Sequence, residues 1–487
     1  MRDYESIIVG AGSAGCVLAA RASEDPSRRV LLLEAGPDYR ADQLPDSLRD
    51  LGMAIEWPHE WGEQVRSRDG RRLPYLRGRG IGGSSSTNGG VAIRPGPDDF
   101  EHWPTGWRWE DLLPCFTKLE RDLDFPDASW HGDRGPIPIT RWKREDWSPF
   151  QQVFVEACLA QGFPECPDHN APHTTGVGAI PMNRVGRKRI SSALSYLESA
   201  RARENLEVRG DTEVRRMLFD AGRTVGVELV DGTRLHADQV IVASGVIQSP
   251  RLLWRSGLGA ADTLRKREIE PLSDLPEVGR NWSDHFVLDC AVEIAPEAFP
   301  KGAQSLQTIV RTTAPGSEQR NDLNLTPWAQ RKPSGASELV VSISLQLPDG
   351  HASSQPGDAQ GESEIDWPFG SMPENVSRLR EGWRMTARIL EASGLVLDPG
   401  ALRTPLHASD TELDTHIEQH HGAFYHGVGT CRLGSDEDSV VDLQCAIRGV
   451  TGAHVVDTSI VPRVPRTNTH LLAVAVAERA SELLWPS

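Results

Sequence analysis

The sequence predicts an α/β fold with two domains, one of which binds a nucleotide and is assembled from separated pieces of the chain. Three observations support this prediction. The chain has 487 residues, more than one ordinary hydrophobic core needs. A strand, a glycine-rich loop, a helix and a second strand follow one another at its start. Three long blocks lack this alternation and separate the later strands from one another.

The first elements form a βαβ unit. Residues 4–9 are a short apolar strand, and residues 14–23 are a helix of small side chains. Residues 29–34 are apolar throughout their middle, which is typical of a parallel strand buried on both faces. The loop that follows the first strand reads Gly10-Ala11-Gly12-Ser13-Ala14-Gly15, and Glu34 ends the second strand.

This unit has the chemistry of a dinucleotide site. Glycines at 10, 12 and 15 let the backbone approach a pyrophosphate at the helix N-terminus. A carboxylate at the position of Glu34 can accept hydrogen bonds from both ribose hydroxyls. The glycine motif alone is weak evidence, but both strands and the acidic residue stand in register with it. Glu34-Ala35-Gly36 favours FAD over NAD, because a small residue after the acid leaves room for adenine.

Later segments extend the same sheet. Residues 206–208 and 225–229 alternate like strands. Residues 240–245 form another strand and turn, which lead into a helix over 249–254. Pro250 is expected in the first turn of that helix, where a missing N–H is tolerated.

A second glycine-rich loop spans residues 78–90 and contains Gly83, Asn88 and Gly89. It could be a flexible surface linker. However, apolar residues bracket it, and a linker has no need of Arg79 and Asn88 among its glycines. The alternative is that its N–H groups line up against a second part of a large cofactor, such as a flavin dinucleotide.

The three interrupting blocks read less clearly. Residues 37–75 are rich in Arg, Asp and Pro, and residues 104–190 are expected to be loops with a few helices. Residues 290–420 contain one strand, over 339–347, and a helix over 374–392. Between these two, residues 348–364 are rich in Gly, Ser, Gln and Asp and predict an exposed loop or a lid.

Composition limits the partners and the location. The net charge of −17 argues against nucleic acid or an anionic membrane as a partner. We find no apolar run of about eighteen residues that would predict a membrane span, and no signal peptide. The seven cysteines lack zinc-type or disulfide-type spacing, so we expect inert thiols, no metal site and a cytoplasmic protein.

The C-terminal region supplies candidate proton-transfer groups. Tyr425-His426-Gly427-Val428-Gly429-Thr430 carries one histidine and Asn468-Thr469-His470 another. Imidazole is the side chain whose ordinary pKa suits a general base near neutral pH. Taken alone, His426 is better explained as a buried structural histidine. Asn468 or Thr469 can cap a buried helix that continues to Leu484.

The chain resembles the glucose-methanol-choline (GMC) family of FAD-dependent oxidoreductases from end to end. The matching motifs follow the family's order: residues 10–37, 80–90, 243–250 with 256–259, 278–285, 425–434 and 457–470. The resemblance implies a Rossmann-like FAD-binding domain made of discontinuous segments (1–36, 76–103, 191–289 and 425–487). It also implies an α+β substrate-binding cap domain with an antiparallel sheet (37–75, 104–190 and 290–424).

The resemblance also implies roles for individual residues. His426 would be the catalytic base and His470 would assist it, although which of the two takes the proton stays open. FAD would contact Gly10, Gly12, Ser13, Ala14, Gly15, Glu34, Ala35, Gly83, Asn88, Gly89, Val214 (backbone, at adenine), Asp457, Asn468 and Thr469. Relatives that attach FAD covalently use a histidine just before the asparagine of the second loop. Thr87 stands there in this chain, which implies non-covalent FAD.

The function implied is oxidation of an alcohol to an aldehyde or ketone, with hydride passing to flavin N5. The electron acceptor would be oxygen, a quinone or a protein. The family also contains a hydroxynitrile lyase, so a lyase or other non-redox flavoprotein is the alternative. A flavin-binding scaffold without enzymatic activity is a third possibility.

Overall fold

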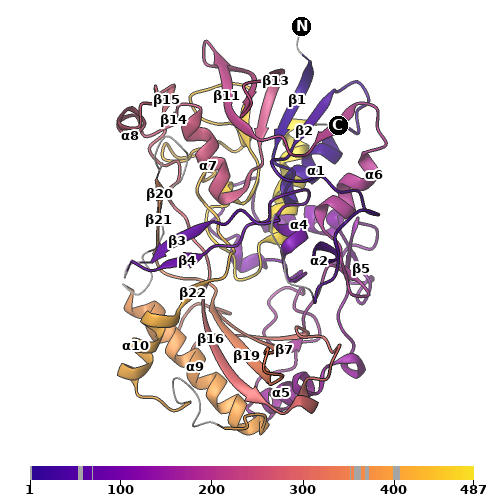
Figure 1. Cartoon of the computed structure of the whole chain (residues 1–487), viewed down its shortest axis with the longest axis vertical. Helices are drawn as coiled ribbons and strands as arrows, with labels where there is room; N and C mark the ends of the chain where they lie inside the picture. The colour runs from indigo at the N-terminus through magenta and orange to yellow at the C-terminus, as the bar shows by residue number, and fades with distance from the viewer. Residues whose placement is uncertain are drawn as a thin grey trace.

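A computed structural model of the chain describes residues 3–52, 59–67, 70–350, 353–355, 364–367, 372–398 and 406–486. Two large sheets organise it. In Figure 1 the first sheet occupies the upper half of the molecule and the second the lower half, with β3 and β4 between them. Each sheet has its own large hydrophobic core.

The first sheet is mixed and has the order β10-β2-β1-β13-β12-β11. Its strands are β1 (Tyr4–Val9), β2 (Val30–Leu33), β10 (Leu206–Arg209), β11 (Val214–Asp220), β12 (Arg223–Leu229), β13 (Arg234–Val242) and β23 (Ala453–Val455). β10, β2, β1, β13 and β23 are parallel, whereas β11 and β12 form an antiparallel extension. The parallel strands β1 and β2 are buried as their apolar sequences predict.

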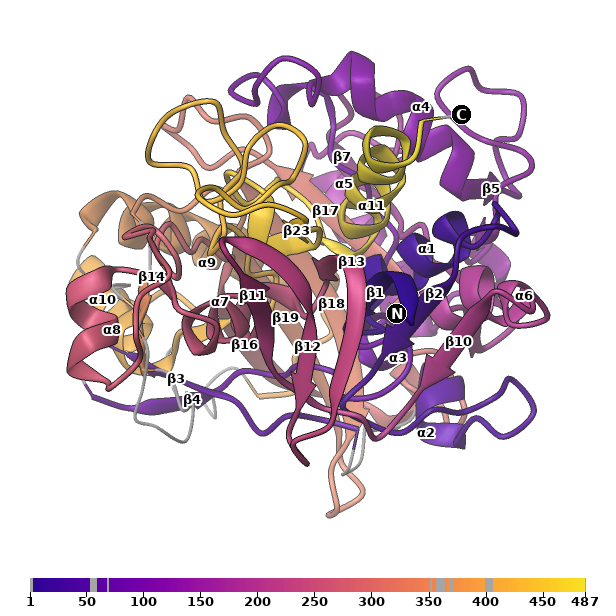
Figure 2. The same ribbon diagram turned by 90° about the horizontal axis from the view of Figure 1, so that it is seen from above.

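Helices pack around this sheet. Figure 2 shows α11 (His470–Leu484) beside α1 (Ser13–Ala22) and α4 (Trp109–Leu119), so the two ends of the chain lie together. The buried helix predicted at the C-terminus is confirmed. Another helix, α7 (Gly245–Arg255), follows β13 and packs against β11.

The start of α7 differs from the prediction. The helix begins at Gly245, so Pro250 lies inside it rather than in its first turn. Proline has no N–H, so it leaves the carbonyl of Val246 without the usual helical donor. The hydroxyl of Thr430 donates to this carbonyl at 2.6 Å and replaces the missing bond.

The second sheet is antiparallel, in the order β22-β16-β19-β18-β17-β7. Its strands are β7 (Gly176–Ala179), β16 (Phe286–Ile294), β17 (Thr308–Thr312), β18 (Leu323–Arg331), β19 (Ser337–Leu345) and β22 (Gly422–Ala423). The sequence predicted only the strand that corresponds to β19. β18 was missed because Pro327 lies within it and polar Asn324 is buried, which hides the strand pattern.

Helices cover one side of this second sheet. They are α5 (Pro149–Ala160), α9 (Pro373–Ser393) and α10 (Asp410–His420), and α9 contacts β16, β18 and β19. The predicted helix over 374–392 is confirmed as α9. Together the two sheets give the α/β fold with an antiparallel second sheet that the sequence analysis expected. The exact domain boundaries stay a prediction.

The loop predicted over 348–364 is wrong in part. A small sheet joins β20 (Ser353–Gln355), β21 (Glu364–Trp367), β3 (Gln64–Ser67) and β4 (Arg72–Pro74). β21 lies parallel to β3, so backbone hydrogen bonds link two of the interrupting blocks. The remainder of the predicted loop, residues 351–352 and 356–363, lies outside the described residues.

Short elements complete the chain. They are α2 (Asp46–Arg49), α3 (Ser84–Thr87), β5 (Glu120–Asp122), β6 (Ile137–Ile139), β8 (Arg184–Val185), β9 (Lys188–Arg189), α6 (Glu198–Ala200), β14 (Leu258–Gly259), α8 (Ala261–Lys266) and β15 (Ser273–Asp274). Over the described part of the chain, every helix is too short or too polar to cross a bilayer.

Candidate active site

A cavity of about 490 Å³ opens at the carboxyl ends of β1 and β13, where Val9 and Ala243 line it. Ligand sites in open α/β sheets favour this position. Both glycine-rich loops and the C-terminal histidines meet in this cavity. The predicted site residues that line it are Gly10, Gly12, Ser13, Ala14, Glu34, Ala35, Gly83, Asn88, Gly89, Val214, His426, Asp457, Asn468, Thr469 and His470.

Gly15 is the one predicted residue that does not line the cavity. A Cβ atom on Gly15 would lie 1.8 Å from the carbonyl oxygen of Gly10. A side chain there would push α1 away from the loop that precedes it. Gly15 therefore holds the helix close to β1, which is one of the uses of glycine in such motifs.

Glu34 joins the two glycine-rich loops. Its Oε2 atom accepts a hydrogen bond from the Ala11 N–H at 2.9 Å, and its Oε1 atom accepts from the N–H groups of Gly36 at 2.9 Å and Gly80 at 3.0 Å. Burial raises the pKa of the carboxyl, although these three bonds favour its charged form. Some of the carboxylate lone pairs that were expected to bind the ribose hydroxyls are therefore used to hold the two loops together.

Two other predicted residues also use their side chains within the protein. The Oδ1 atom of Asn88 accepts from the Gly90 N–H at 2.9 Å, which shapes the second loop. Asp457 accepts from the Gly245 N–H at the start of α7 and from the hydroxyl of Ser249. Both residues line the cavity while they fix the backbone around it.

The helix α11 begins at the cavity wall. Thr469 occupies its N-cap position, as expected for one of two candidates, but its side chain makes no capping hydrogen bond. Asn468 does not cap the helix, since its Nδ2 atom lies 3.0 Å from Nε2 of His426. The helix start therefore presents its N–H groups and partial positive charge without a side-chain cap.

A local bulge places His426. β22 pairs with β16 through Ala423 and Phe286, and Ser283 pairs further along with Val428. Between these pairs, residues 284–285 on one strand face the longer segment 424–427 on the other. The extra residues must loop out of the ladder. They carry Phe424, Tyr425 and His426 to the wall of the cavity.

The same ladder brings a third histidine into the site. Nδ1 of the buried His285 lies 2.9 Å from Nδ1 of His426, and Nε2 of His285 lies 2.7 Å from the carbonyl oxygen of Pro465. Burial lowers the pKa of His285 to about 4. Burial, followed by the proximity of His285 and Arg77, lowers the pKa of His426 well below its ordinary value, so both rings are neutral at neutral pH.

Asp284 holds the backbone of both histidines. Its Oδ1 atom accepts from the N–H groups of His285 at 2.6 Å and His426 at 2.7 Å, and its Oδ2 atom accepts from the hydroxyl of Tyr75. Burial raises the pKa of this carboxyl to about 6 despite these bonds. Asp284 contacts main-chain groups rather than the imidazole rings, so it supports the geometry of the pair.

Tyr425 adopts an unusual backbone conformation next to His426. Its φ angle is 64°, in the left-handed region that bulky residues rarely occupy. Its carbonyl accepts a hydrogen bond from the guanidinium of Arg77, and its ring packs edge-on against Tyr75 at 5.7 Å. Strain of this kind persists only where surrounding contacts hold it, and it is common at functional sites.

His470 lies on the same cavity wall and is 7% exposed. Neither of its ring nitrogens has a hydrogen-bond partner among the described residues. Burial lowers its pKa to about 4, so the ring is neutral at neutral pH. A buried polar ring without a partner indicates that a bound molecule completes its hydrogen bonding.

Sequence reasoning missed His285, Asp284, Tyr75 and Arg77. The segment 278–285 was noticed as a family-like motif, but nothing local placed it beside His426. Only the pairing of β16 with β22 does so. Phe424, whose ring lies edge-on to that of His426 at 5.0 Å, was missed for the same reason.

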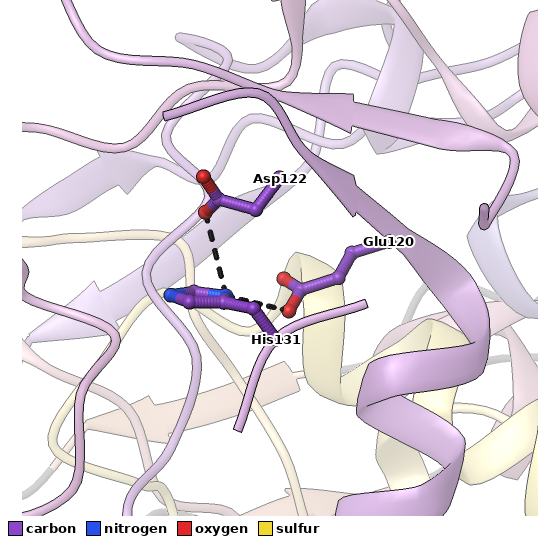
Figure 3. Close-up of side chains that lie close together, drawn as sticks. All are labelled: Glu120, Asp122 and His131. Carbon is purple, nitrogen blue, oxygen red and sulfur yellow. Dashed lines mark hydrogen bonds and ion pairs between the residues drawn. The ribbon is translucent and has the colours of Figure 1, made fainter. Parts of the chain in front are cut away.

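A second cluster of buried ionisable groups lies away from the cavity. Figure 3 shows His131 between Glu120 and Asp122, with Nδ1 of His131 2.7 Å from Oε1 of Glu120 and 3.4 Å from Oδ2 of Asp122. These side chains are of types that can bind a metal ion. However, Arg94 pairs with Glu120, and Arg141 pairs with both Asp122 and Asp168.

The charges of this cluster balance without a metal. Burial alone would lower the pKa of His131, but hydrogen bonds to Asp168 and Glu120 and the nearby carboxylates raise it to about 9. Three buried carboxylates therefore meet two guanidiniums and one imidazolium, and the partly exposed Asp124 also contacts Arg141. This arrangement fits an internal ion-pair network better than a metal site, because a ligating imidazole nitrogen cannot keep its proton.

The fold and the cavity define a class of α/β protein in which two glycine-rich loops and neutral histidines line one cavity. The GMC oxidoreductase family matches the chain over residues 4–287 and 348–477. An uncharacterized GMC-type oxidoreductase of Rhodococcus erythropolis is 36% identical, with 99% of this chain and 98% of the relative covered. The chain therefore belongs to the GMC oxidoreductase family and is an oxidoreductase.

Two further proteins are similar over nearly their whole length. A 5-(hydroxymethyl)furfural oxidase of a Methylovorus species is 32% identical, with 99% of this chain and 98% of the relative covered. The crystal structure of pyridoxine 4-oxidase from Mesorbium loti has a TM-score of 0.88 and 27% identity, with 99% of each chain covered. These similarities confirm the resemblance and the fold that the sequence predicted.

GMC oxidoreductases are FAD-dependent, and the cavity fits this cofactor. The backbone of the first glycine-rich loop is exposed to it at Gly10 and Gly12, next to the uncapped start of α1. The other parts are lined by the second loop, the uncapped start of α11 and the ring of His470, which has no partner among the described residues. The roles of the individual residues stay predictions.

Proposed function

We propose that this protein catalyses the FAD-dependent oxidation of an alcohol to an aldehyde or ketone, with His426 as the general base and His470 assisting. The observation that carries this proposal is the position of two neutral histidines in the same cavity as two glycine-rich loops. An alcohol must lose a proton from oxygen as hydride leaves carbon. When bound, FAD supplies the hydride acceptor.

His426 is the better candidate for the base. Among the described residues, its Nε2 atom is hydrogen-bonded to the amide of Asn468, which is a donor, so this nitrogen presents a lone pair. A hydroxyl group of the substrate could replace that amide or share the lone pair. Its lowered pKa keeps the ring in the basic form across the neutral range.

His470 is proposed to hold the substrate oxygen. Because both of its ring nitrogens lack partners among the described residues, one can donate a hydrogen bond to the alcohol oxygen. That bond would strengthen as negative charge develops on the oxygen, and it would leave proton transfer to His426. If the roles are exchanged, the loss of His470 will remove more of the rate than the loss of His426.

We propose non-covalent binding of FAD. Thr87 lines the cavity at the position where a histidine attaches the flavin in some relatives. Among the described residues, His426 and His470 are the histidines of the lining, and no cysteine belongs to it. Denaturation followed by ultrafiltration should therefore release all of the yellow cofactor into the filtrate.

The substrate is proposed to be an uncharged alcohol on an apolar or aromatic body. The apolar and aromatic side chains of the cavity wall include Trp61, Leu76, Val91, Leu306, Phe424 and Tyr425. Of the charged groups in the wall, Glu63 is paired with Arg251, whereas the guanidinium of Arg77 acts on His426. A positive charge near the proposed base disfavours a cationic alcohol such as choline. The relative named 5-(hydroxymethyl)furfural oxidase is, by its name, an oxidase of such a ring-bound alcohol.

Anaerobic mixing tests the proposal. Purified protein is mixed without oxygen with benzylic, furanic, aliphatic and cationic alcohols while flavin absorbance is followed. We expect bleaching by the uncharged ring alcohols and little by choline. A flavin that stays oxidised with every alcohol, while cyanohydrins are cleaved, would instead establish the lyase alternative. Readmission of oxygen, a quinone or a protein acceptor then identifies the second substrate by the rate of recolouring.

A further inference from the structure

His285 takes no part in the proposed reaction, yet it is fully buried and hydrogen-bonded at both ring nitrogens. The carbonyl of Pro465 can only accept a hydrogen bond, so Nε2 of His285 must carry a hydrogen. In a neutral imidazole the other nitrogen then has a lone pair. Nδ1 of His285 is therefore an acceptor, and it faces Nδ1 of His426.

This arrangement fixes the tautomer of His426. Because Nδ1 of His285 accepts, Nδ1 of His426 must donate and carries the hydrogen of the neutral ring. The Nε2 atom of His426 is then left with the lone pair. The amide of Asn468 at 3.0 Å from this nitrogen is a donor, which agrees with the same assignment.

We propose that His285 is a positioning residue for His426. Its Nε2–H group binds the carbonyl of Pro465, so its Nδ1 atom accepts a hydrogen bond from His426 and keeps the basic nitrogen of His426 directed into the cavity. The proposal rests on the function proposed above for His426. In many enzymes a carboxylate fixes the catalytic imidazole. Here the nearest carboxylate, Asp284, is occupied by main-chain N–H groups and the hydroxyl of Tyr75.

A neutral partner has a chemical consequence. When the alcohol gives its proton to Nε2 of His426, the imidazolium keeps its Nδ1–H bond to the lone pair of His285. No proton passes to His285, whose other nitrogen already carries one. The positive charge on His426 is thus stabilised by a neutral imidazole rather than by an anion. His426 therefore remains a weak base and releases the proton readily.

Three substitutions of His285 separate positioning from mere packing. The Oδ1 atom of His285→Asn can take the place of the imidazole Nδ1 and accept from His426. In His285→Gln the amide lies at the Nε2 position, and His285→Phe supplies no acceptor. We expect His285→Asn to reduce flavin within about threefold of the wild-type rate and the other two to lose about tenfold or more, in kcat rather than KM.

Nitrogen NMR of ¹⁵N-histidine-labelled protein reads the tautomer directly and does not depend on activity. The His426 signals are assigned by their loss in His426→Ala. We expect a protonated Nδ1 and a bare Nε2 in the wild type, and a shift toward the other tautomer in His285→Phe. Retained FAD and melting temperature show that a variant is folded.

The outcomes are distinct. A protonated Nε2 on His426 in the wild-type protein would overturn the proposal even if every variant failed to fold. Equal rates in the Asn, Gln and Phe variants would also overturn it. Failure of all alcohols to reduce wild-type flavin would instead refute the proposed function, while the NMR assignment would still decide the tautomer.

Discussion

Gly12 and Gly83 are in backbone contact, although they belong to different glycine-rich loops. A Cβ atom on Gly83, whose φ angle is 50°, would lie 2.8 Å from Cα of Gly12. Glu34 reinforces this contact by binding the N–H groups of Ala11 and Gly80. One cavity wall is thus made from two loops that only the tertiary fold brings together.

Gly83→Ala should weaken FAD binding. The new methyl group meets the backbone of Gly12, and the left-handed conformation costs about 1–2 kcal/mol for a residue with a side chain. We expect the Kd for FAD to rise by at least about tenfold, as measured by calorimetry on the apoprotein. Gly96→Ala is the matched control, since nothing lies within 4 Å of its added Cβ. An unchanged Kd in Gly83→Ala would show that the loops need not touch.

Glu34→Gln should have a related effect through hydrogen bonding. The amide can accept at one oxygen only, so its NH₂ group must face at least one of the N–H donors that Glu34 now binds. Each lost buried bond costs about 1–3 kcal/mol. We expect FAD to be lost on gel filtration, whereas the exposed control Glu437→Gln should retain it. Full retention by Glu34→Gln would contradict the role given to this carboxylate.

The sequence predicted the local parts of this site well. The glycines, Glu34, His426 and His470 stand in short motifs whose spacing follows from how one strand, loop or helix meets a ligand. Each lines the cavity except Gly15, which packs α1 against its own loop. The fold class was predictable for the same reason, because β1, α1 and β2 form one continuous unit.

The missed parts depend on contacts between distant segments. His285 lies beside His426 only because β16 pairs with β22 and the ladder bulges between Ala423 and Val428. The proline in α7 could not be placed from sequence, because Thr430 supplies its compensating hydrogen bond from another part of the chain. Such relationships leave no periodic signal along either segment.

Thr430→Val tests that compensation. It removes the donor to the carbonyl of Val246, which is buried with no N–H at Pro250 to replace it. We expect a loss of about 1–3 kcal/mol in the free energy of unfolding by urea. In a Pro250→Ala background the residue at 250 regains its N–H, so the same Thr430 substitution should cost about 1 kcal/mol less. Additive effects would show that Thr430 and Pro250 are not coupled.

The ion-pair network around His131 predicts a pH-dependent stability. The pKa of His131 is raised from 6.5 to about 9. Its contribution to the free energy of unfolding is therefore complete below pH 6.5 and is lost as the pH rises through 9. The shift corresponds to about 3 kcal/mol of unfolding free energy. Urea titrations across this range should show the loss in the wild type and in the exposed-site control His173→Gln. The loss should be absent in His131→Gln, and a wild-type curve that is flat would contradict the network.

Asp168 predicts the opposite behaviour in acid. Burial opposes ionisation, but the hydrogen bond from His131 and the charge of Arg141 lower the pKa of Asp168 below its ordinary value. Its contribution to the free energy of unfolding is therefore present above pH 3.8 and is lost as the pH falls below that value. Asp168→Asn should be less stable than wild type at neutral pH, with the difference shrinking in acid.

Rapid anaerobic mixing of His426→Ala with a reducing alcohol is the most direct test of the account. A general base contributes about 10²–10⁴ in rate, so flavin reduction should slow by that factor while FAD content stays at the wild-type level. Restoration of part of the rate by added imidazole would support the same role. A variant that binds FAD and is reduced as fast as the wild-type protein would contradict the assignment of His426.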